Sequence, residues 1–225
     1  MAWKEAPAHM PAARTVLAID LSTPRGVIVV VRGDDILFES SFQSERSHNA
    51  QVFAPLAEAL AVIPEGEKAT LVVGTGPGSY TGVRISIAAA QGVALSRGWP
   101  VLGWPSIATA EITDYQVIGD ARRGQFYHAT IQAGHMTLAP QIITADEAST
   151  LVTVGGTWLT FDAKPPLALA AVTLAQPDAA ALGRFIAQLP ESEIEACAAR
   201  PLEPFYLQEA FVTVARKAGK QVAVR

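Results

Sequence analysis

The sequence predicts a duplicated two-lobe α/β fold, and three observations lead to this prediction. The first is size, because 225 residues of which 50% are hydrophobic suffice for one large domain or two small lobes. The second is the order βββαβα of the elements expected between residues 15 and 97. The third is a strand–Asp–turn–strand pattern that occurs at Asp20 and again at Asp120. Two such patterns at the heads of similar segments indicate an internal duplication.

The elements of the first lobe follow from short apolar runs and the turns between them. Three β-rich runs, separated by turn residues, predict an antiparallel meander over residues 16–20, 27–32 and 36–42. Apolar residues at three- and four-residue spacings predict a helix over 48–63, with Ser47 as its N-cap. A buried strand over 69–74 and a Gly-rich loop then lead into an Ala-rich helix that reaches Arg97.

The second lobe is shorter and less regular. Strands are expected over 115–120 and 125–132, a helix start over 145–150, a strand over 151–154 and a helix over 178–189. We therefore expect a disordered leader over 1–14, a first lobe over 15–105 and a second, reduced lobe over 106–190. The segment 191–225 is expected to return to the first lobe.

Charge and residue counts exclude several classes of protein. A net charge of −4 argues against an autonomous nucleic-acid binder, which needs surplus Lys and Arg. Cys197 is the sole cysteine, so no intrachain disulfide forms, and the four histidines lack the spacing of a metal site. No apolar run approaches the roughly 20 residues that span a bilayer. We expect a cytoplasmic protein with no membrane contact and no metal of its own.

Two aspartate turns could have contacted phosphate. Asp20 and the following Leu-Ser-Thr resemble the phosphate-binding turn of the actin, sugar-kinase and Hsp70 superfamily. Pro24 and Arg25 replace the glycine that such a turn needs, so an Asx turn without a ligand is the alternative. We interpret these positions as degraded phosphate turns: Asp20, Ser22, Thr23 and Asp120.

The Gly-rich loop matches neither Gly-x-Gly-x-x-Gly nor a lysine-bearing P-loop. Two interpretations stay open. The helix N-terminus that follows could hold an anion, with Ser79, Thr81 and Arg84 nearby. Alternatively, the loop is a tight strand-to-helix turn that Ser79 or Thr81 caps.

The two helices of the first lobe carry more apolar and small residues than one face of a lobe needs. Small residues permit close approach of another helix, so either the second helix is buried within its lobe or it forms a subunit interface. We predict a partner surface. Its expected members are His48, Val52, Pro55, Leu56, Ala59, Ile85, Ala89, Gly92 and Ser96.

In order along the chain, these segments resemble the bacterial TsaB (YeaZ) family from about residue 15 to 130. The specific part is the run Gly-Pro-Gly-Ser-Tyr-Thr-Gly-Val-Arg, which contributes the family-motif loop Gly76, Pro77, Gly78, Ser79, Tyr80, Thr81, Gly82 and Arg84. The segments 16–20, 91–94 and 120–127 also match. Asn49 departs from the family pattern after His48.

The resemblance implies an actin/Hsp70-like (ASKHA) fold and a non-catalytic subunit that pairs with a TsaD-like protein. TsaD, with the TsaE-like ATPase, transfers a threonylcarbamoyl group to N6 of adenosine 37 in tRNA. ATP and metal are expected on TsaD, because this chain lacks the paired histidines that hold the metal there. Contact with tRNA is expected to be indirect, and a homodimer can form without the partner.

A function of another class stays open. The alternative is a stand-alone enzyme of the same superfamily, either a small-molecule kinase or a peptidase-like hydrolase. We expect no enzyme activity, since no nucleophile–base pair, metal ligands or P-loop lysine are assembled in the sequence. Turnover by the isolated chain would distinguish the two hypotheses.

Overall fold

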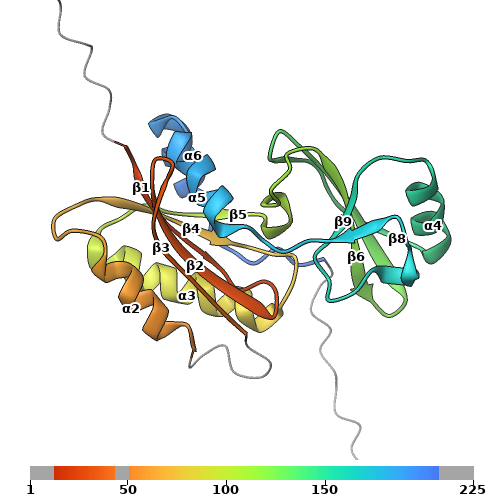
Figure 1. Ribbon diagram of the computed structural model, residues 1–225, viewed down its shortest axis with the longest axis horizontal. Coiled ribbons are helices and arrows are strands. Elements are labelled where there is room, and N and C mark those ends of the chain that lie inside the picture. Colours follow the sequence, from red (N-terminus) through yellow and green to blue (C-terminus); the bar gives the residue numbers. More distant parts are fainter. Residues whose placement is uncertain (1–12, 44–50, 208–225) are drawn as a thin grey trace, which may run out of the picture.

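The computed structural model describes residues 13–43 and 51–207, which form two lobes around two five-stranded sheets (Figure 1). The first sheet contains strands in the order β3-β2-β1-β4-β5. Strands β1 and β4 are buried along their whole length, as their mostly apolar sequences favour. The strand bounds are β1 Thr15–Asp20, β2 Arg25–Arg32, β3 Asp35–Gln43, β4 Ala69–Gly74 and β5 Val101–Trp104.

Helices cover both faces of the first sheet. Alternate side chains of β1 point to opposite faces, so Leu17 packs in the core under α2 (Phe53–Ala61) and α3 (Tyr80–Arg97). Val16 belongs to the core on the opposite face, where α5 (Ala179–Gln188) packs against β1 and β2. The last helix, α6 (Glu191–Ala198), lies beside β5 (Figure 1).

The second sheet repeats the first. Its strand order, read from the meander side, is β8-β7-β6-β9-β10, with the same antiparallel and parallel pairings. This confirms the duplicated two-lobe fold. The bounds are β6 Tyr115–Arg122, β7 Gln125–Gln132, β8 His135–Ile143, β9 Trp158–Thr160 and β10 Val172–Leu174, with helix α4 Ala145–Thr153 and 3-10 helices η1 Ser106–Ala108 and η2 Pro166–Ala168.

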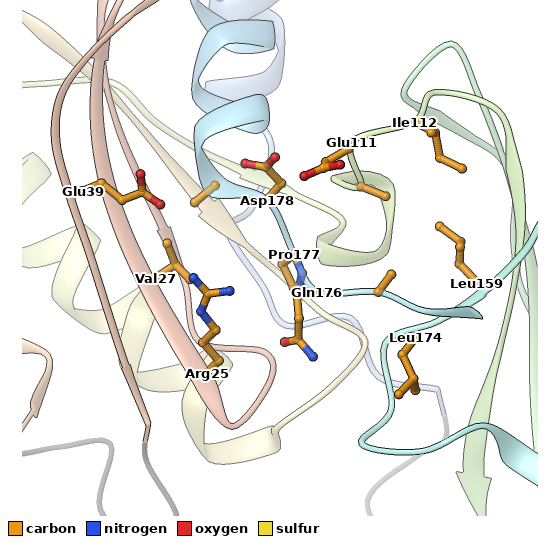
Figure 2. A pocket seen from close by; sticks show the side chains of 13 residues that line it. Arg25, Val27, Glu39, Glu111, Ile112, Leu159, Leu174, Gln176, Pro177 and Asp178 are labelled. Atoms are coloured by element: carbon orange, nitrogen blue, oxygen red, sulfur yellow. The ribbon is translucent and has the colours of Figure 1, made fainter. Parts of the chain in front are cut away.

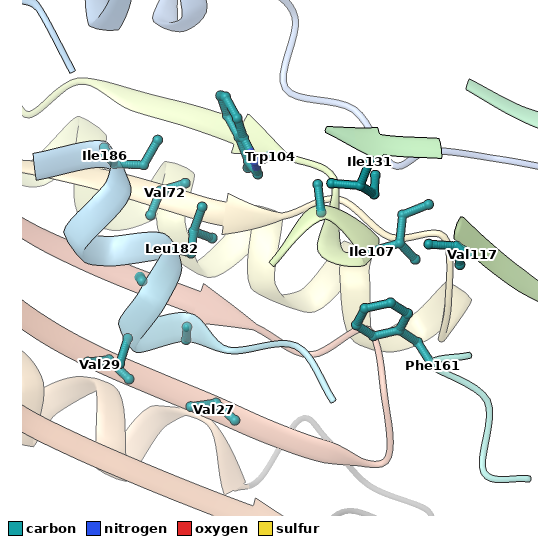
Figure 3. Packing of buried hydrophobic residues seen from close by; sticks show 14 of the residues in the cluster. Val27, Val29, Val72, Trp104, Ile107, Val117, Ile131, Phe161, Leu182 and Ile186 are labelled. Carbon is teal, nitrogen blue, oxygen red and sulfur yellow. The ribbon is translucent and has the colours of Figure 1, made fainter. Parts of the chain in front are cut away.

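One hydrophobic core joins the lobes (Figure 3). It contains Val72 of the first sheet, Leu182 of α5, Ile107 of η1 and Val117 of the second sheet, all buried. Trp104 at the end of β5 packs its ring against Phe185 of α5, with ring centroids 5.1 Å apart. The lobes are therefore connected by buried side chains as well as by the chain.

The structure differs from the expectations at several places, and the strands β8, β9 and β10 were not predicted. The expected second lobe ends at residue 190, but α5 packs on the first sheet, because its apolar face fits β1 and β2. Residues 151–153 continue α4 and are no strand, since the capping box of Thr144 and Glu147 starts a helix that extends through them. Of the leader expected over 1–14, residues 1–12 lie outside the described residues. Arg14 is ordered against the first lobe, because its guanidinium donates to the carbonyls of Ile186 and Leu189.

The described part of the C-terminal segment lies against the first lobe. Leu202 packs on the core under α2 and α3, and the Phe205 N–H donates to the Thr75 carbonyl at 2.8 Å. Residues 208–225 lie outside the described residues. Within the described part of the chain, no helix has the length and apolar character needed to cross a membrane.

Candidate functional site

The family-motif loop joins β4 to α3 and lies at the junction of the two lobes. The Thr75 N–H donates to the Trp104 carbonyl at 2.8 Å, and the Gly76 N–H donates to Ser106 Oγ at 2.9 Å. The Gly76–Pro77 peptide bond is cis. These contacts fix the loop against the chain that leads to the second lobe.

The loop also packs against the turn that follows Asp20. The Ser79 N–H donates to the Ser22 carbonyl at 2.6 Å, and Ser79 Oγ caps α3 by accepting from the Gly82 N–H at 3.1 Å. A Cβ at Gly78 would lie 2.2 Å from the Ser22 carbonyl oxygen. A Cβ at Gly82 would lie 2.0 Å from that of Leu21. The motif glycines therefore permit backbone-to-backbone contact, and the structure supports the capped turn.

Asp20 is buried beneath this contact. Its Oδ1 accepts from the Ser22 N–H at 2.7 Å, which is the expected Asx turn. Asp20 Oδ2 and Ser22 Oγ have no hydrogen-bond partner of normal geometry among the described residues. Burial raises the pKa of Asp20, and the nearby hydroxyls of Ser22 and Ser106 offset this only in part.

Asp120 makes the same turn in the second lobe but stays exposed. Its Oδ1 accepts from the Arg122 N–H at 2.7 Å, and its N–H donates to Asp162 Oδ2 at 2.7 Å. Burial and the Asp120 charge raise the pKa of Asp162. Arg122 and Arg123 have φ angles of 73° and 58°, in the left-handed region that costs non-glycine residues about 1 kcal/mol or more.

A cleft of about 1220 Å³ brings these elements together between the lobes. The predicted positions Ser22, Thr23 and Asp120 line it, as does much of the family-motif loop; the loop members that line it are Pro77, Gly78, Ser79, Tyr80 and Thr81. Asp20 does not line it. Two further residues that line the cleft, Asp162 and Lys164, were not identified from the sequence. They belong to no motif, and only the fold places them at the cleft.

An aromatic stack, formed by Tyr80, Arg84 and Tyr206, stands at one side of the cleft. The Arg84 guanidinium lies 4.2 Å from the centre of the Tyr80 ring and 5.8 Å from that of Tyr206. Arg84 Nε also donates to Tyr206 Oη at 2.9 Å, and this bond raises the pKa of the guanidinium. Tyr80 and Tyr206 are still about half exposed, at 52% and 46%. The stack leaves aromatic surface open to a ligand.

A second pocket, of about 490 Å³, lies where β2 and β3 face the strand ends of the second lobe (Figure 2). The carboxylates of Glu39, Glu111 and Asp178 line it together with Arg25. Asp178 caps α5 by accepting from the Ala181 N–H at 2.8 Å. Among the described residues, no group of three or more His, Cys, Asp or Glu side chains could hold a metal ion.

The structure corrects part of the predicted partner surface. Val52, Leu56 and Ala59 are buried in the core between α2 and the first sheet, because α2 needs its apolar stripe to cover its own lobe. They cannot contact a partner in this fold. His48 lies outside the described residues. Pro55, Ile85 and Ala89 are half-buried.

Gly92 and Ser96 of α3 are exposed, so these two positions stay available to a partner. Two large exposed apolar side chains of these helices were missed by sequence reasoning, one on α3 and one on α2. Leu95 is 88% exposed, and Phe53 at the start of α2 is 59% exposed. Periodicity could have identified Leu95, which lies one helical turn from Gln91 on the polar side of the helix.

Comparisons with known proteins agree with this architecture. The model of the family TsaD, tRNA N6-adenosine threonylcarbamoyltransferase, matches residues 42–166. The tRNA threonylcarbamoyladenosine biosynthesis protein TsaB of Bacillus subtilis is 32% identical over 127 residues, which cover 52% of this chain and 55% of that protein. TsaB of Escherichia coli is 32% identical over 130 residues, covering 52% and 54%.

An uncharacterised protein of Mycobacterium tuberculosis is 36% identical over 140 residues, which cover 58% of this chain and 65% of that protein. The chain thus spans less than two thirds of the length of the curated relatives that it matches. Among solved structures, YeaZ from Pseudomonas aeruginosa superposes with a TM-score of 0.61 at 22% identity, covering 86% of this chain and all of that one. This likeness shows the fold.

Proposed function

Because the chain belongs to the TsaB (YeaZ) family, we propose that it is a non-catalytic subunit that pairs with a TsaD-like protein in tRNA N6-threonylcarbamoylation. In this role the chain acts as a scaffold or activator. ATP and metal reside on the TsaD-like partner, which a TsaE-like ATPase assists. The expected cellular location is the cytoplasm, where tRNA is modified.

The observation that carries the proposal is the exposed face of α2 and α3, the two helices that lie together on one side of the first sheet (Figure 1). Leu95 is 88% exposed and Phe53 59% exposed, so two large apolar side chains face water. Exposed apolar side chains of this size are available to an apolar surface of a partner. The small residues Gly92 and Ser96 beside Leu95 let a partner helix approach closely.

The turns support a non-catalytic role. The Asp20 turn is occupied by its own chain, since Ser79 bonds to the Ser22 carbonyl and Gly78 and Gly82 approach the turn backbone. A phosphate group would have to displace this contact to reach Asp20. In an ASKHA enzyme this position needs an accessible carboxylate, whereas the Asp20 side chain is buried.

The variant Gly92→Arg tests the pairing. A Cβ at Gly92 meets no atom within 4 Å, so the larger side chain leaves the free chain folded. In the complex it would place a bulky charge between the helices, which should abolish co-purification with a TsaD-like protein and lower affinity at least 100-fold, equivalent to about 3 kcal/mol.

The matched control is Val154→Arg, which adds the same charge at an 82% exposed position of the second lobe. It should leave pairing intact, and circular-dichroism melts should show both variants folded. Unchanged pairing of folded Gly92→Arg would place the partner surface elsewhere. Steady-state turnover by the isolated chain, lost in Asp20→Asn, would favour the stand-alone enzyme instead.

A further inference from the structure

The cleft between the lobes has a charge opposite to that of the whole protein. Among the described residues that line it, the cations are Arg122, Arg123 and Lys164, and the anions are Asp120 and Asp162. Arg84 adds a positive charge at the aromatic stack. The protein as a whole has a net charge of −4, so this local excess of positive charge is not a property of its general surface.

We propose that this cleft binds single-stranded RNA, with Tyr80 and Tyr206 as stacking surfaces for bases and Arg122 and Lys164 as contacts to phosphates. Proteins that bind single strands combine a positive groove with aromatic rings on which bases stack. The choice of RNA rests on the proposed tRNA role. The proposal goes against the expectation that this chain contacts tRNA only indirectly.

The aromatic stack is preorganised for such a contact. Arg84 covers one face of Tyr80 at 4.2 Å and holds Tyr206 through the 2.9 Å bond to its hydroxyl, yet both rings remain about half exposed. The ring centroids lie 5.7 Å apart with a tilt of 36°, so the pair is already packed in the free chain. A base that stacks there orders few side chains, which lowers the entropic cost of binding.

The cations lie on the opposite lobe. Arg122 has a side chain 86% exposed and contacts Asp120 only at 3.5 Å, so its guanidinium can also reach a phosphate. Exposed ion pairs of this kind contribute little energy and exchange readily. Lys164, which is exposed, follows Asp162 in the loop after β9. A strand in the cleft would therefore touch rings of one lobe and cations of the other.

Size favours a polymer over a free nucleotide. The cleft of about 1220 Å³ is larger than the ~300–1000 Å³ that encloses a typical small ligand. The basic residues Arg216, Lys217, Lys220 and Arg225 lie outside the described residues, so the proposed site does not include them.

The test measures fluorescence anisotropy of a labelled anticodon stem-loop RNA with the full chain over a range of KCl concentrations. Tyr80→Ala and Tyr206→Ala should each weaken binding about ten-fold, since stacking contributes roughly 1–3 kcal/mol per base. Tyr206→Phe keeps the ring and should stay within about two-fold of the wild type. Melting curves establish that each variant is folded.

The salt dependence tests the phosphate contacts. Lys164→Ala should lower the slope of log affinity against log salt by about 0.7, the value for one phosphate on a single strand. Lys68→Ala removes one equally exposed lysine outside the cleft and should leave the slope unchanged.

Three results would overturn the proposal. One is no RNA binding by the folded chain. Another is binding that is equal in Tyr206→Ala and Tyr206→Phe but lost on removal of residues 208–225, which would assign the affinity to the terminal segment alone. The third is stack-dependent binding of ATP without RNA binding, which would make the cleft a nucleotide site. Gly92→Arg separates this proposal from the pairing, because it should lose the TsaD-like partner and keep the RNA.

Discussion

The two lobes contain the same Asx turn in opposite environments. Asp20 Oδ1 accepts from the Ser22 N–H and Asp120 Oδ1 from the Arg122 N–H, each at 2.7 Å. The Asp20 side chain is buried, whereas that of Asp120 is 43% exposed and lines the cleft. The two lobes therefore share the conformation of the turn, but the environment of the aspartate side chain differs between them.

The loops that follow β4 and β9 account for the difference. In the first lobe the family-motif loop packs its backbone onto the turn, and α3 begins at Tyr80. In the second lobe the corresponding segment contains Lys164, Pro165 and Pro166 and forms only the short η2. Leu167 and Ala168 have φ angles of 54° and 52°, in the left-handed region, so the helical turn that starts at Pro166 does not continue. The family-motif loop thus covers the Asp20 turn. The second lobe has no such loop, so the Asp120 turn is open to solvent.

The largest expected effect comes from breaking that closure. Gly82→Ala places a Cβ 2.0 Å from the Leu21 carbonyl oxygen, so the loop and the turn must separate. We expect a loss of about 3 kcal/mol or more in the free energy of unfolding, measured by urea denaturation. Gly92→Ala in the same helix meets no atom within 4 Å and should stabilise by about 0.5–1 kcal/mol. Equal effects of both variants would contradict this role of Gly82.

The next effect compares the caps of the two lobes. Ser79→Ala removes the acceptor of the Gly82 N–H, and Thr144→Ala removes the capping box that starts α4. Each substitution should lower the free energy of unfolding by about 1 kcal/mol. This corresponds to a decrease of roughly 2–4 °C in Tm, measured by differential scanning calorimetry. The control Thr150→Ala, at an exposed position within α4, should leave Tm unchanged or slightly raised. A cost at Thr150 as large as at Thr144 would show that the cap is not the cause.

The smallest effect concerns the buried and exposed aspartates. The pKa of Asp20 is raised in the folded state, so its charge destabilises the fold as pH rises above the unfolded value of 3.8. Asp20→Asn should therefore raise Tm at pH 7, and the gain should vanish as pH falls towards 3.8. Asp120→Asn should change little. A lower Tm of Asp20→Asn at pH 7 would contradict the conclusion that the buried charge destabilises the fold.

Much of the fold was predictable because it is local. The strand–Asp–turn–strand patterns predicted β1, β2, β6 and β7, and the spacing of apolar residues predicted α2, whereas β8, the third strand of the second meander, was not predicted. The strand expected over 151–154 was wrong. So short an apolar run is compatible with the period of a strand and with that of a helix, and the capping box of Thr144 and Glu147 indicates the helix.

The candidate site was less predictable, because it depends on contacts distant in sequence. Leu56 and Val52 have the pattern of a helix with an apolar stripe, which does not reveal whether the stripe meets its own sheet or a partner. Tyr206 stacks on Tyr80 from the far end of the chain. The placement of α5 on the first sheet required the same long-range information.

The core that joins the lobes makes the protein one cooperative folding unit. Ile107, Val117, Leu182 and Phe161 bury apolar area that belongs to neither sheet alone. A hinge motion that separated the lobes would expose this apolar area to water, at a free-energy cost of roughly 25 cal/mol for each Å². The two halves of the chain should therefore unfold together, and neither should remain soluble when expressed without the other.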